Sequence, residues 1–322
     1  MFHAKTQRRK GFKLQAASCK LRKAASYELR VARSTFRRLP SKLCVSFASP
    51  RETFFRALFA LFLFLFLSGA AVAQDSTFRQ VRSIKGDIVD AAVDHLDNIY
   101  LISSTGQIKK LNAAGDSLAV YNQQKNFGQP HAIDVSNPLK ILLFYKDFST
   151  VIVLDRFLSV RATLDLKRFN ILQPGAVGLS YDNNIWVFDE YDNKLKKIDE
   201  QGASLQENTD LRNVFAEGLA PQRIINRNGL VYLADTAQGI FVFDNYGAFK
   251  KKLPLSRWQS FEVFRDDVVT IGSGSIYFYN PSNFIQRQYR LPSFQPYFHS
   301  VIGNGRLMIL SKEGMAIYEM RR

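Results

Sequence analysis

Glutamine recurs ahead of five successive apolar segments of this 322-residue chain, usually beside proline. The five are Gln129, Gln173, Gln222, Gln259 and Gln295. Arg223, Trp258 and Tyr297 stand next to or near three of them and add cationic and flat aromatic surface, which is enriched in binding hot spots. Neutral amides of this kind can hydrogen-bond a sugar, a peptide or a protein loop. They can equally tie a loop to its neighbour, and the sequence leaves both interpretations open.

Histidine is the second residue type that could do chemistry here. His131 and His299 lie in the same kind of segment as the glutamines, so we count them among the candidate ligand-binding residues. Imidazole is a common zinc ligand, but two histidines without a third ligand make a poor zinc site. We therefore expect no metal and no other cofactor.

These candidates belong to a repeat. Six short apolar strands align, and their third residues follow one another at intervals of 37 to 46 residues. The third residues are Tyr100, Leu142, Trp186, Tyr232, Val269 and Met308. Units of this length have room for four strands each, which indicates a β-propeller with six blades. Turn residues separate the strands and no segment has a sustained helical stripe, so we expect an all-β protein.

The two ends of the repeat predict how the ring closes. The sixth unit stops at Arg322, directly after its third strand, whereas residues 78–84 form an extra strand ahead of the first unit. Pairing this strand with the last blade supplies the missing strand and removes an exposed edge. We expect a propeller over residues 74–322 in which the glutamines, His131 and His299 surround one mouth of the central channel. His95, in a turn between strands, should lie far from the channel.

The repeat units resemble NHL-type repeats of six-bladed propellers. The resemblance rests on Gln-Pro-His-Ala-Ile-Asp-Val at 129–135, on Asp-His-Leu-Asp-Asn-Ile-Tyr-Leu at 94–101 and on residues 222–244. It covers about residues 78–322 and implies the fold rather than a function, because propellers host many unrelated functions. Lyases similar to this family hold a catalytic metal near the channel with several histidines.

The resemblance leaves an enzymatic alternative open. Hydrolases of the gluconolactonase type gather Glu, Asn and Asp side chains around an axial Ca²⁺, an ion that prefers oxygen ligands. Asp134, Asp189 and Asp235 are candidates for such a site, although Asp189 and Asp235 end strands, where an aspartate normally caps the next turn. Glu262 lies within a strand, so no entry loop supplies the expected glutamate.

Residues 51–73 have the pattern of a signal peptide. The uninterrupted apolar run 57–67 follows two arginines, and it is shorter than the ~20 residues that a membrane-spanning helix needs. Small residues at Ala71 and Ala73 predict cleavage after Ala73, with an uncleaved signal anchor as the alternative. Residues 1–50 are a basic leader, either disordered or the result of a misplaced start. We expect export to the periplasm, the outer surface or the medium.

The formal charge of +16 is concentrated in this leader. Residues 1–73 contain 15 Lys and Arg and two acidic residues, so the remaining chain is nearly neutral and lacks the basic excess of a nucleic-acid-binding protein. Both cysteines, Cys19 and Cys44, lie in the part that cleavage removes. The mature chain then contains no thiol, which excludes cysteine nucleophiles, cysteine-ligated zinc and iron–sulfur clusters.

The sequence therefore favours a non-enzymatic binding module of the cell envelope. We expect a monomer that binds a protein, a peptide or a glycan at the channel mouth and meets the membrane only through its transient signal peptide. A metal-dependent hydrolase or lyase of the gluconolactonase-like or NHL-like type is the alternative.

Overall fold

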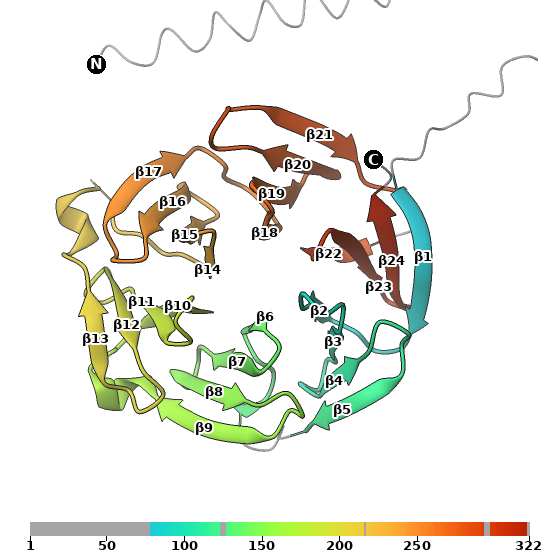
Figure 1. Cartoon of the computed structure of the whole chain (residues 1–322), viewed down its shortest axis with the longest axis horizontal. Coiled ribbons are helices and arrows are strands. Elements are labelled where there is room, and N and C mark those ends of the chain that lie inside the picture. Colours follow the sequence, from blue (N-terminus) through green and yellow to red (C-terminus); the bar gives the residue numbers. More distant parts are fainter. Residues whose placement is uncertain (1–77, 123–126, 216, 293–296, 321–322) are drawn as a thin grey trace, which may run out of the picture. The chain divides into compact units, whose positions relative to one another are not determined.

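The computed structural model describes residues 78–122, 127–215, 217–292 and 297–320, without the side chains of 297, 298 and 320. These residues form a six-bladed β-propeller, as predicted, in which six four-stranded antiparallel sheets are arranged around a central axis (Figure 1). The innermost strands are β2 (Asp90–Val93), β6 (Ala132–Asn137), β10 (Pro174–Leu179), β14 (Arg223–Arg227), β18 (Ser260–Phe264) and β22 (Tyr297–Gly303).

The two middle strands of each blade follow. The second strands are β3 (Ile99–Ile102), β7 (Lys140–Tyr145), β11 (Ile185–Asp189), β15 (Leu230–Asp235), β19 (Asp267–Gly272) and β23 (Arg306–Ser311). The third strands are β4 (Ile108–Leu111), β8 (Thr150–Leu154), β12 (Lys194–Ile198), β16 (Gly239–Asp244), β20 (Ser275–Tyr279) and β24 (Gly314–Met320). Most of these strands are nearly continuous apolar runs because each has a neighbouring blade on both of its faces. Strands β4 and β12 also carry lysines, of which Lys110, Lys196 and Lys197 are buried.

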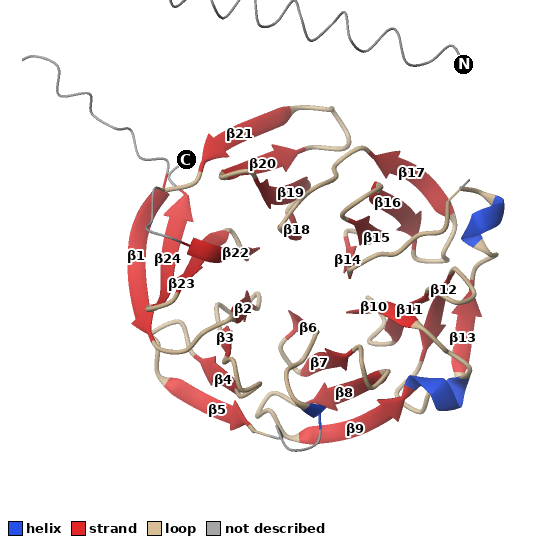
Figure 2. Cartoon of the chain, turned by 180° about the vertical axis from the view of Figure 1, so that it is seen from behind, coloured by secondary structure: helices blue, strands red, loops and turns tan. Residues whose placement is uncertain are grey.

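The outer strands contain fewer apolar residues because one edge of each blade meets solvent. They are β5 (Ser117–Tyr121), β9 (Val160–Asp165), β13 (Ser204–Glu207), β17 (Phe249–Leu253), β21 (Gln286–Arg290) and β1 (Phe78–Lys85). Two short 3-10 helices, Leu166–Phe169 and Leu211–Asn213, follow β9 and β13 at the rim of the ring (Figure 2). No helix among the described residues is long and apolar enough to cross a membrane.

The ring closes as the sequence predicts. Strand β1 pairs antiparallel with β24 and completes the last blade, with Arg79 opposite Glu319 and Lys85 opposite Gly314. Phe78 is buried in the apolar cluster between the fifth and sixth blades. The chain thus joins its first described strand to its last, which removes the free edge that β24 would otherwise present.

The core is divided into six apolar clusters, each between two successive blades. Between the third and fourth blades, for example, Trp186 and Phe188 of β11 belong to one cluster with Phe241 and Phe243 of β16, and all four side chains are fully buried. Burial of this apolar surface is the main force that holds each blade against the next.

Candidate functional site

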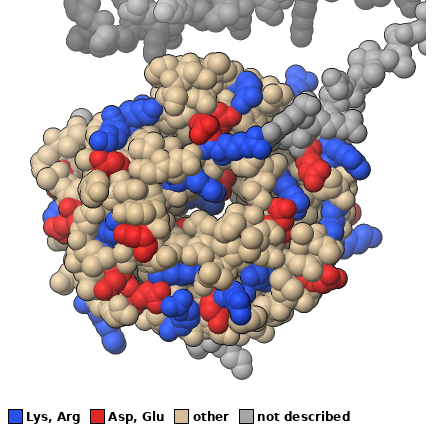
Figure 3. Space-filling model, viewed as in Figure 1, with Lys and Arg blue, Asp and Glu red and all other residues tan. Residues whose placement is uncertain are grey.

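A cavity of about 280 Å³ runs along the axis of the ring. Five inner strands (β2, β6, β14, β18 and β22) supply most of its lining, and β10 contributes only Val177. In the space-filling view the ring is hollowed at its centre, and positive and negative side chains are interspersed over the surrounding face (Figure 3).

Strand register decides which residues share a level of the channel. One level consists of the residues that pair with the third residues of the aligned strands: Ala92, Asp134, Gly178, Ile225, Glu262 and Val301. The level nearer the mouth lies two residues earlier on each inner strand and consists of Asp90, Ala132, Ala176, Arg223, Ser260 and His299. Each level therefore carries ionisable side chains from only some of the blades: Asp134 and Glu262 in the first, and Asp90, Arg223 and His299 in the level nearer the mouth.

Arg223 is the principal cationic group at the mouth. Its Nη2 lies 3.5 Å from Oε2 of Glu262 on the neighbouring strand β18, and its side chain is 37% exposed. A contact this long is weak, so most of the guanidinium donors remain available. Arg227, four residues further along β14, is exposed and lines the same cavity.

Glu262 is a largely buried ionisable group of the cavity, with a side chain 15% exposed. Burial raises the pKa of its carboxyl, and the positive charge of Arg223 opposes this shift without cancelling it. Desolvation disfavours the charged form of a carboxyl, which explains the direction. Its Oε1 accepts a hydrogen bond from the backbone N–H of Val263 at 3.0 Å.

Two imidazoles lie at the mouth, as predicted. Nε2 of His299 lies 3.5 Å from Oδ1 of Asp90, which also accepts the backbone N–H of Ala91 at 2.8 Å. His131 lies edge-on to Phe144, with 5.9 Å between ring centroids. Burial lowers the pKa of His131, and the ammonium of Lys146 adds to this shift, so its imidazole is neutral over more of the pH range than usual.

His95 corrects one sequence expectation. It lines the cavity, at the end away from His131 and His299, whereas the sequence placed it far from the channel. The turn that contains His95 begins directly after the inner strand β2 (Asp90–Val93), so it belongs to the wall of the cavity. Asp94 fixes that turn by accepting the backbone N–H groups of Leu96 and Asn98, both at 2.9 Å.

The glutamines divide into two groups. Gln222 and Gln259 line the cavity, whereas Gln129 and Gln173 lie outside its lining and Gln295 lies outside the described residues. Gln173 Nε2 donates to Oε2 of Glu190 at 2.9 Å, within its own blade. Gln222 also makes local bonds, because its Oε1 accepts the backbone N–H of Thr236 at 2.8 Å and its Nε2 donates to the carbonyl of Ala220.

The aromatic candidates also differ. Trp258 lines the cavity and packs against the apolar cluster between the fourth and fifth blades, with its ring centroid 5.8 Å from that of Phe261. Its indole Nε1 is buried and has no hydrogen-bond partner among the described residues. Tyr297 begins β22, and its backbone pairs with Ser311.

The three aspartates considered as calcium ligands are engaged in hydrogen bonds to the main chain. Asp189 Oδ1 accepts the N–H of Gln173 at 3.0 Å, and Asp235 Oδ2 accepts that of Ala220 at 3.0 Å. Both carboxylates thus hold the loop that leads into their own blade. Asp134 Oδ2 accepts the N–H of Leu179 at 2.7 Å and joins β6 to β10 across the blade boundary. The described residues contain no group of three or more His, Asp or Glu side chains arranged to hold a metal ion.

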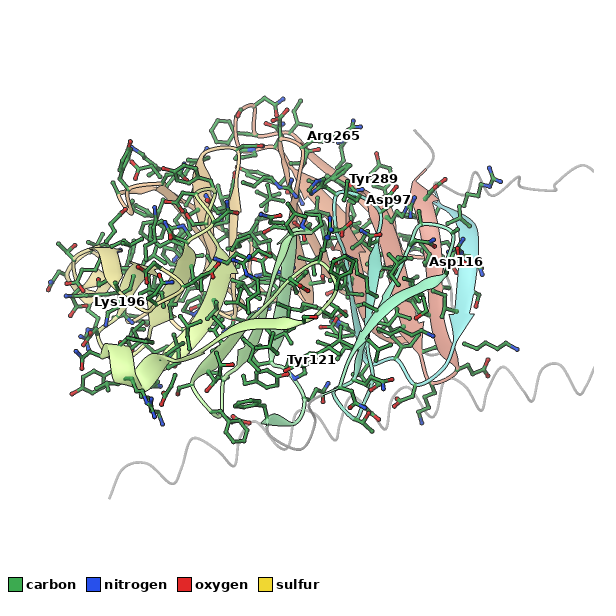
Figure 4. All side chains as sticks on the ribbon, turned by 60° about the horizontal axis from the view of Figure 1, so that its bottom comes forward. Asp97, Asp116, Tyr121, Lys196, Arg265 and Tyr289 are labelled. Carbon is green, nitrogen blue, oxygen red and sulfur yellow. The ribbon has the colours of Figure 1, made fainter. Side chains whose placement is uncertain are left out.

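At the end of the channel away from the mouth, side-chain hydrogen bonds connect neighbouring blades. Oδ2 and Oδ1 of Asp97, in the turn after β2, accept hydrogen bonds from Arg306 at 3.1 Å and from Asn304 at 2.7 Å, which joins the sixth blade to the first. Figure 4 shows Asp97 and Arg265, both in turns that follow inner strands, on the same side of the ring. Asn226 Oδ1 accepts the backbone N–H of Tyr181 at 2.6 Å. The channel walls are therefore held at fixed spacing.

Asp90 and Arg227 are not among the residues predicted from the sequence, and Glu262 was set aside there because it belongs to a strand. That strand proves to be innermost, so Glu262 faces the cavity. The alignment of the second strands contains the information needed to find these residues. Each third residue pairs with one residue of the antiparallel inner strand, and this pairing identifies the inner-strand residues that share a level of the channel. Attention to the entry loops alone does not find them.

No protein-family model matches the chain, and no curated protein matches it significantly. Solved structures share its fold. A streptogramin B lyase structure has a TM-score of 0.51 at 16% identity and covers 73% of this chain and 79% of its own. A catalytically inactive virginiamycin B lyase from Staphylococcus aureus with quinupristin has a TM-score of 0.52 at 10% identity, with coverage of 76% and 99%. The WD40 domain of Neurospora crassa Pan2 has a TM-score of 0.52 at 10% identity, with coverage of 73% and 79%. Likeness at these identities establishes the propeller fold alone.

Proposed function

We propose that this chain is an exported, non-enzymatic propeller that binds a ligand or a partner protein at the mouth of its channel. One observation carries the proposal. The mouth opens into a cavity in which Arg223 has, among the residues that the structure describes, a single 3.5 Å ionic contact, and its side chain is 37% exposed. A guanidinium with unused donors in a concave, partly apolar site is a typical anchor for a ligand or a partner.

The groups around Arg223 suit recognition rather than a proton-transfer reaction. Gln259 and Trp258 lie on the same side of the cavity and offer an amide and an aromatic face. Asp134 uses both carboxylate oxygens in bonds to backbone N–H groups of Ser136 and Leu179, so it has a structural task already. The signal-peptide pattern of residues 51–73 and the cysteine-free chain after it support a place in the cell envelope or outside the cell.

The tryptophans provide the experiment. The chain has two, and Trp186 is fully buried between blades whereas Trp258 lines the cavity. The protein is purified from cells that express the whole chain, and its N-terminus is determined; the expected first residue is Gln74, in an exported fraction. Peptides, sugars, small acids and envelope proteins are then titrated while tryptophan emission is recorded.

The proposal predicts that at least one of them changes the emission of the wild type and not of Trp258→Phe, and binds Arg223→Ala at least tenfold more weakly. Binding that is indifferent to Arg223→Ala would contradict it. Stoichiometric bound metal, together with turnover that a chelator abolishes, would replace it with the hydrolase or lyase alternative. Recovery of the protein only in the cytoplasm with residues 51–73 intact would contradict the export part.

A further inference from the structure

We propose that the channel ligand is a small zwitterion of the amino-acid or short-peptide class, with its carboxylate on Arg223 and its ammonium on Asp90. The inference rests on the proposed function and names the ligand class of the same cavity. It follows from the way in which opposite charges are distributed over opposite walls of the channel.

The cationic wall is strand β14. Arg223 and Arg227 both line the cavity and are four residues apart, which places them about 13 Å from one another along an extended strand. Among the described residues, Arg227 has no acidic partner within ion-pair distance, and Arg223 has only the 3.5 Å contact with Glu262. Burial raises the pKa of Glu262 and so disfavours its charged form, which weakens its competition with a ligand for Arg223.

The acidic wall lies across the channel. In a ring of six blades the first faces the fourth, and Figure 1 shows β2 and β14 on opposite sides of the axis. Asp90 on β2 occupies the same level as Arg223, and its side chain is 37% exposed. Its Oδ1 receives Ala91 N–H and faces His299, whereas its Oδ2 has no hydrogen-bond partner in the described structure. That oxygen is free to accept a hydrogen bond from an ammonium group.

This arrangement disfavours a ligand of one charge. A simple anion drawn to Arg223 would meet the carboxylates of Asp90 and Asp134, and a simple cation drawn to Asp90 would meet Arg223. A ligand that carries both charges pairs with both walls at once. The cavity of about 280 Å³ lies just below the range for ligand sites, ~300 to 1,000 Å³, which favours a small ligand.

The test uses three probes that differ only at their ends: triglycine, N-acetyl-triglycine and triglycine amide. Binding is measured by calorimetry on the protein purified from cells expressing the whole chain. Triglycine should bind about 10- to 100-fold more tightly than either blocked form, because each block removes one charged hydrogen-bonded pair. Glycine and diglycine, measured alongside, report the spacing of the two walls.

Two variants assign the ends of the ligand. Asp90→Asn should abolish the preference for triglycine over N-acetyl-triglycine, and Arg223→Lys should reduce the preference for triglycine over its amide, because lysine lacks the bidentate fork. Arg265→Ala, in a turn outside the cavity lining, should leave both preferences unchanged. These preferences are ratios within one variant, so a general loss of stability does not imitate the result.

The outcomes separate the two proposals. If N-acetyl-triglycine binds as tightly as triglycine, the site recognises an anion and the zwitterion is wrong, while a binding function stands. If all of the glycine probes fail but a sugar, a protein or another acid binds in an Arg223-dependent manner, the zwitterion is again wrong and the proposed function stands. If nothing binds in the channel, both fall.

Discussion

Lys196 of β12 gives the sharpest test of how the blades hold their entry loops. Its Nζ lies 2.8 Å from Oδ2 of Asp189 and 2.6 Å from Oδ2 of Asp192. The Lys196 side chain is 8% exposed and that of Asp189 is fully buried. Burial lowers the pKa of Lys196, but the hydrogen bonds that its ammonium donates to both aspartates outweigh burial and hold the pKa above its usual value. The ammonium is therefore fully charged at neutral pH.

The substitution Lys196→Met keeps an unbranched side chain, one atom shorter, and removes its charge. Asp189 would then be buried beside no cation, and removal of one partner from a buried ion pair costs about 3–5 kcal/mol. For a propeller of this size a loss of 1 kcal/mol lowers the melting temperature by about 2–4 °C, so the expected decrease is roughly 6–20 °C. The stabilising charge is present throughout neutral pH and is lost only as pH rises through the pKa of Lys196.

The assay is urea unfolding at pH 7, with Lys194→Met as the matched control. Lys194 lies on the same strand and pairs with Glu207 at 3.0 Å, but its side chain is 27% exposed and that of Glu207 is 50% exposed. An exposed pair contributes about 1 kcal/mol or less. Adding Asp189→Asn to Lys196→Met should recover part of the loss. If Lys196→Met is no more destabilising than Lys194→Met, the buried pair does not hold this loop.

Three further predictions concern the channel and the closure of the ring. Because burial raises the pKa of Glu262, the folded state binds its proton more tightly than the unfolded state, so wild-type stability falls as pH rises from about 4.5 through the folded-state pKa. Glu262→Gln should then raise the melting temperature at pH 8 and leave it nearly unchanged at pH 4; a lower value at pH 8 would show that the Arg223 pair outweighs burial. Gly178→Ala should cost about 1–3 kcal/mol in urea unfolding, because a Cβ at this position would lie 2.6 Å from the carbonyl oxygen of Ile224, and unchanged stability would show that the two blades can separate there. A chain that begins at Gly86 lacks β1 and should associate through the exposed edge of β24 in size-exclusion chromatography, whereas a monomer with an unchanged melting temperature would contradict the closure argument.

The architecture was predictable because its signal is repeated six times. Aligned runs such as those around Tyr100 and Trp186 recur at nearly constant intervals, and both residues are buried in the second strands where the alignment placed them. Closure by residues 78–84 followed from counting strands, and β1 extends this segment by one residue to Lys85. Weak local propensities become decisive when one pattern must satisfy six equivalent positions.

The site was only partly predictable because side-chain direction depends on register and on local hydrogen bonds. His131, His299, Arg223, Gln222 and Gln259 lie at the cavity as their sequence positions suggested. The glutamine pattern could not reveal that the Gln173 amide turns to Glu190 in its own blade. Nor does the sequence show directly that Glu262 lines the cavity. Successive side chains of a strand point to opposite faces, so the direction of any one of them is known only once the register with the partner strand is known.

The most direct test of the proposed ligand site is a crystal structure of the protein grown with saturating triglycine. The account predicts one molecule in the central cavity, with its carboxylate within hydrogen-bond distance of the Arg223 guanidinium and its ammonium at Asp90. An empty cavity in saturated crystals, or a peptide bound only on the outer surface of the ring, would contradict it.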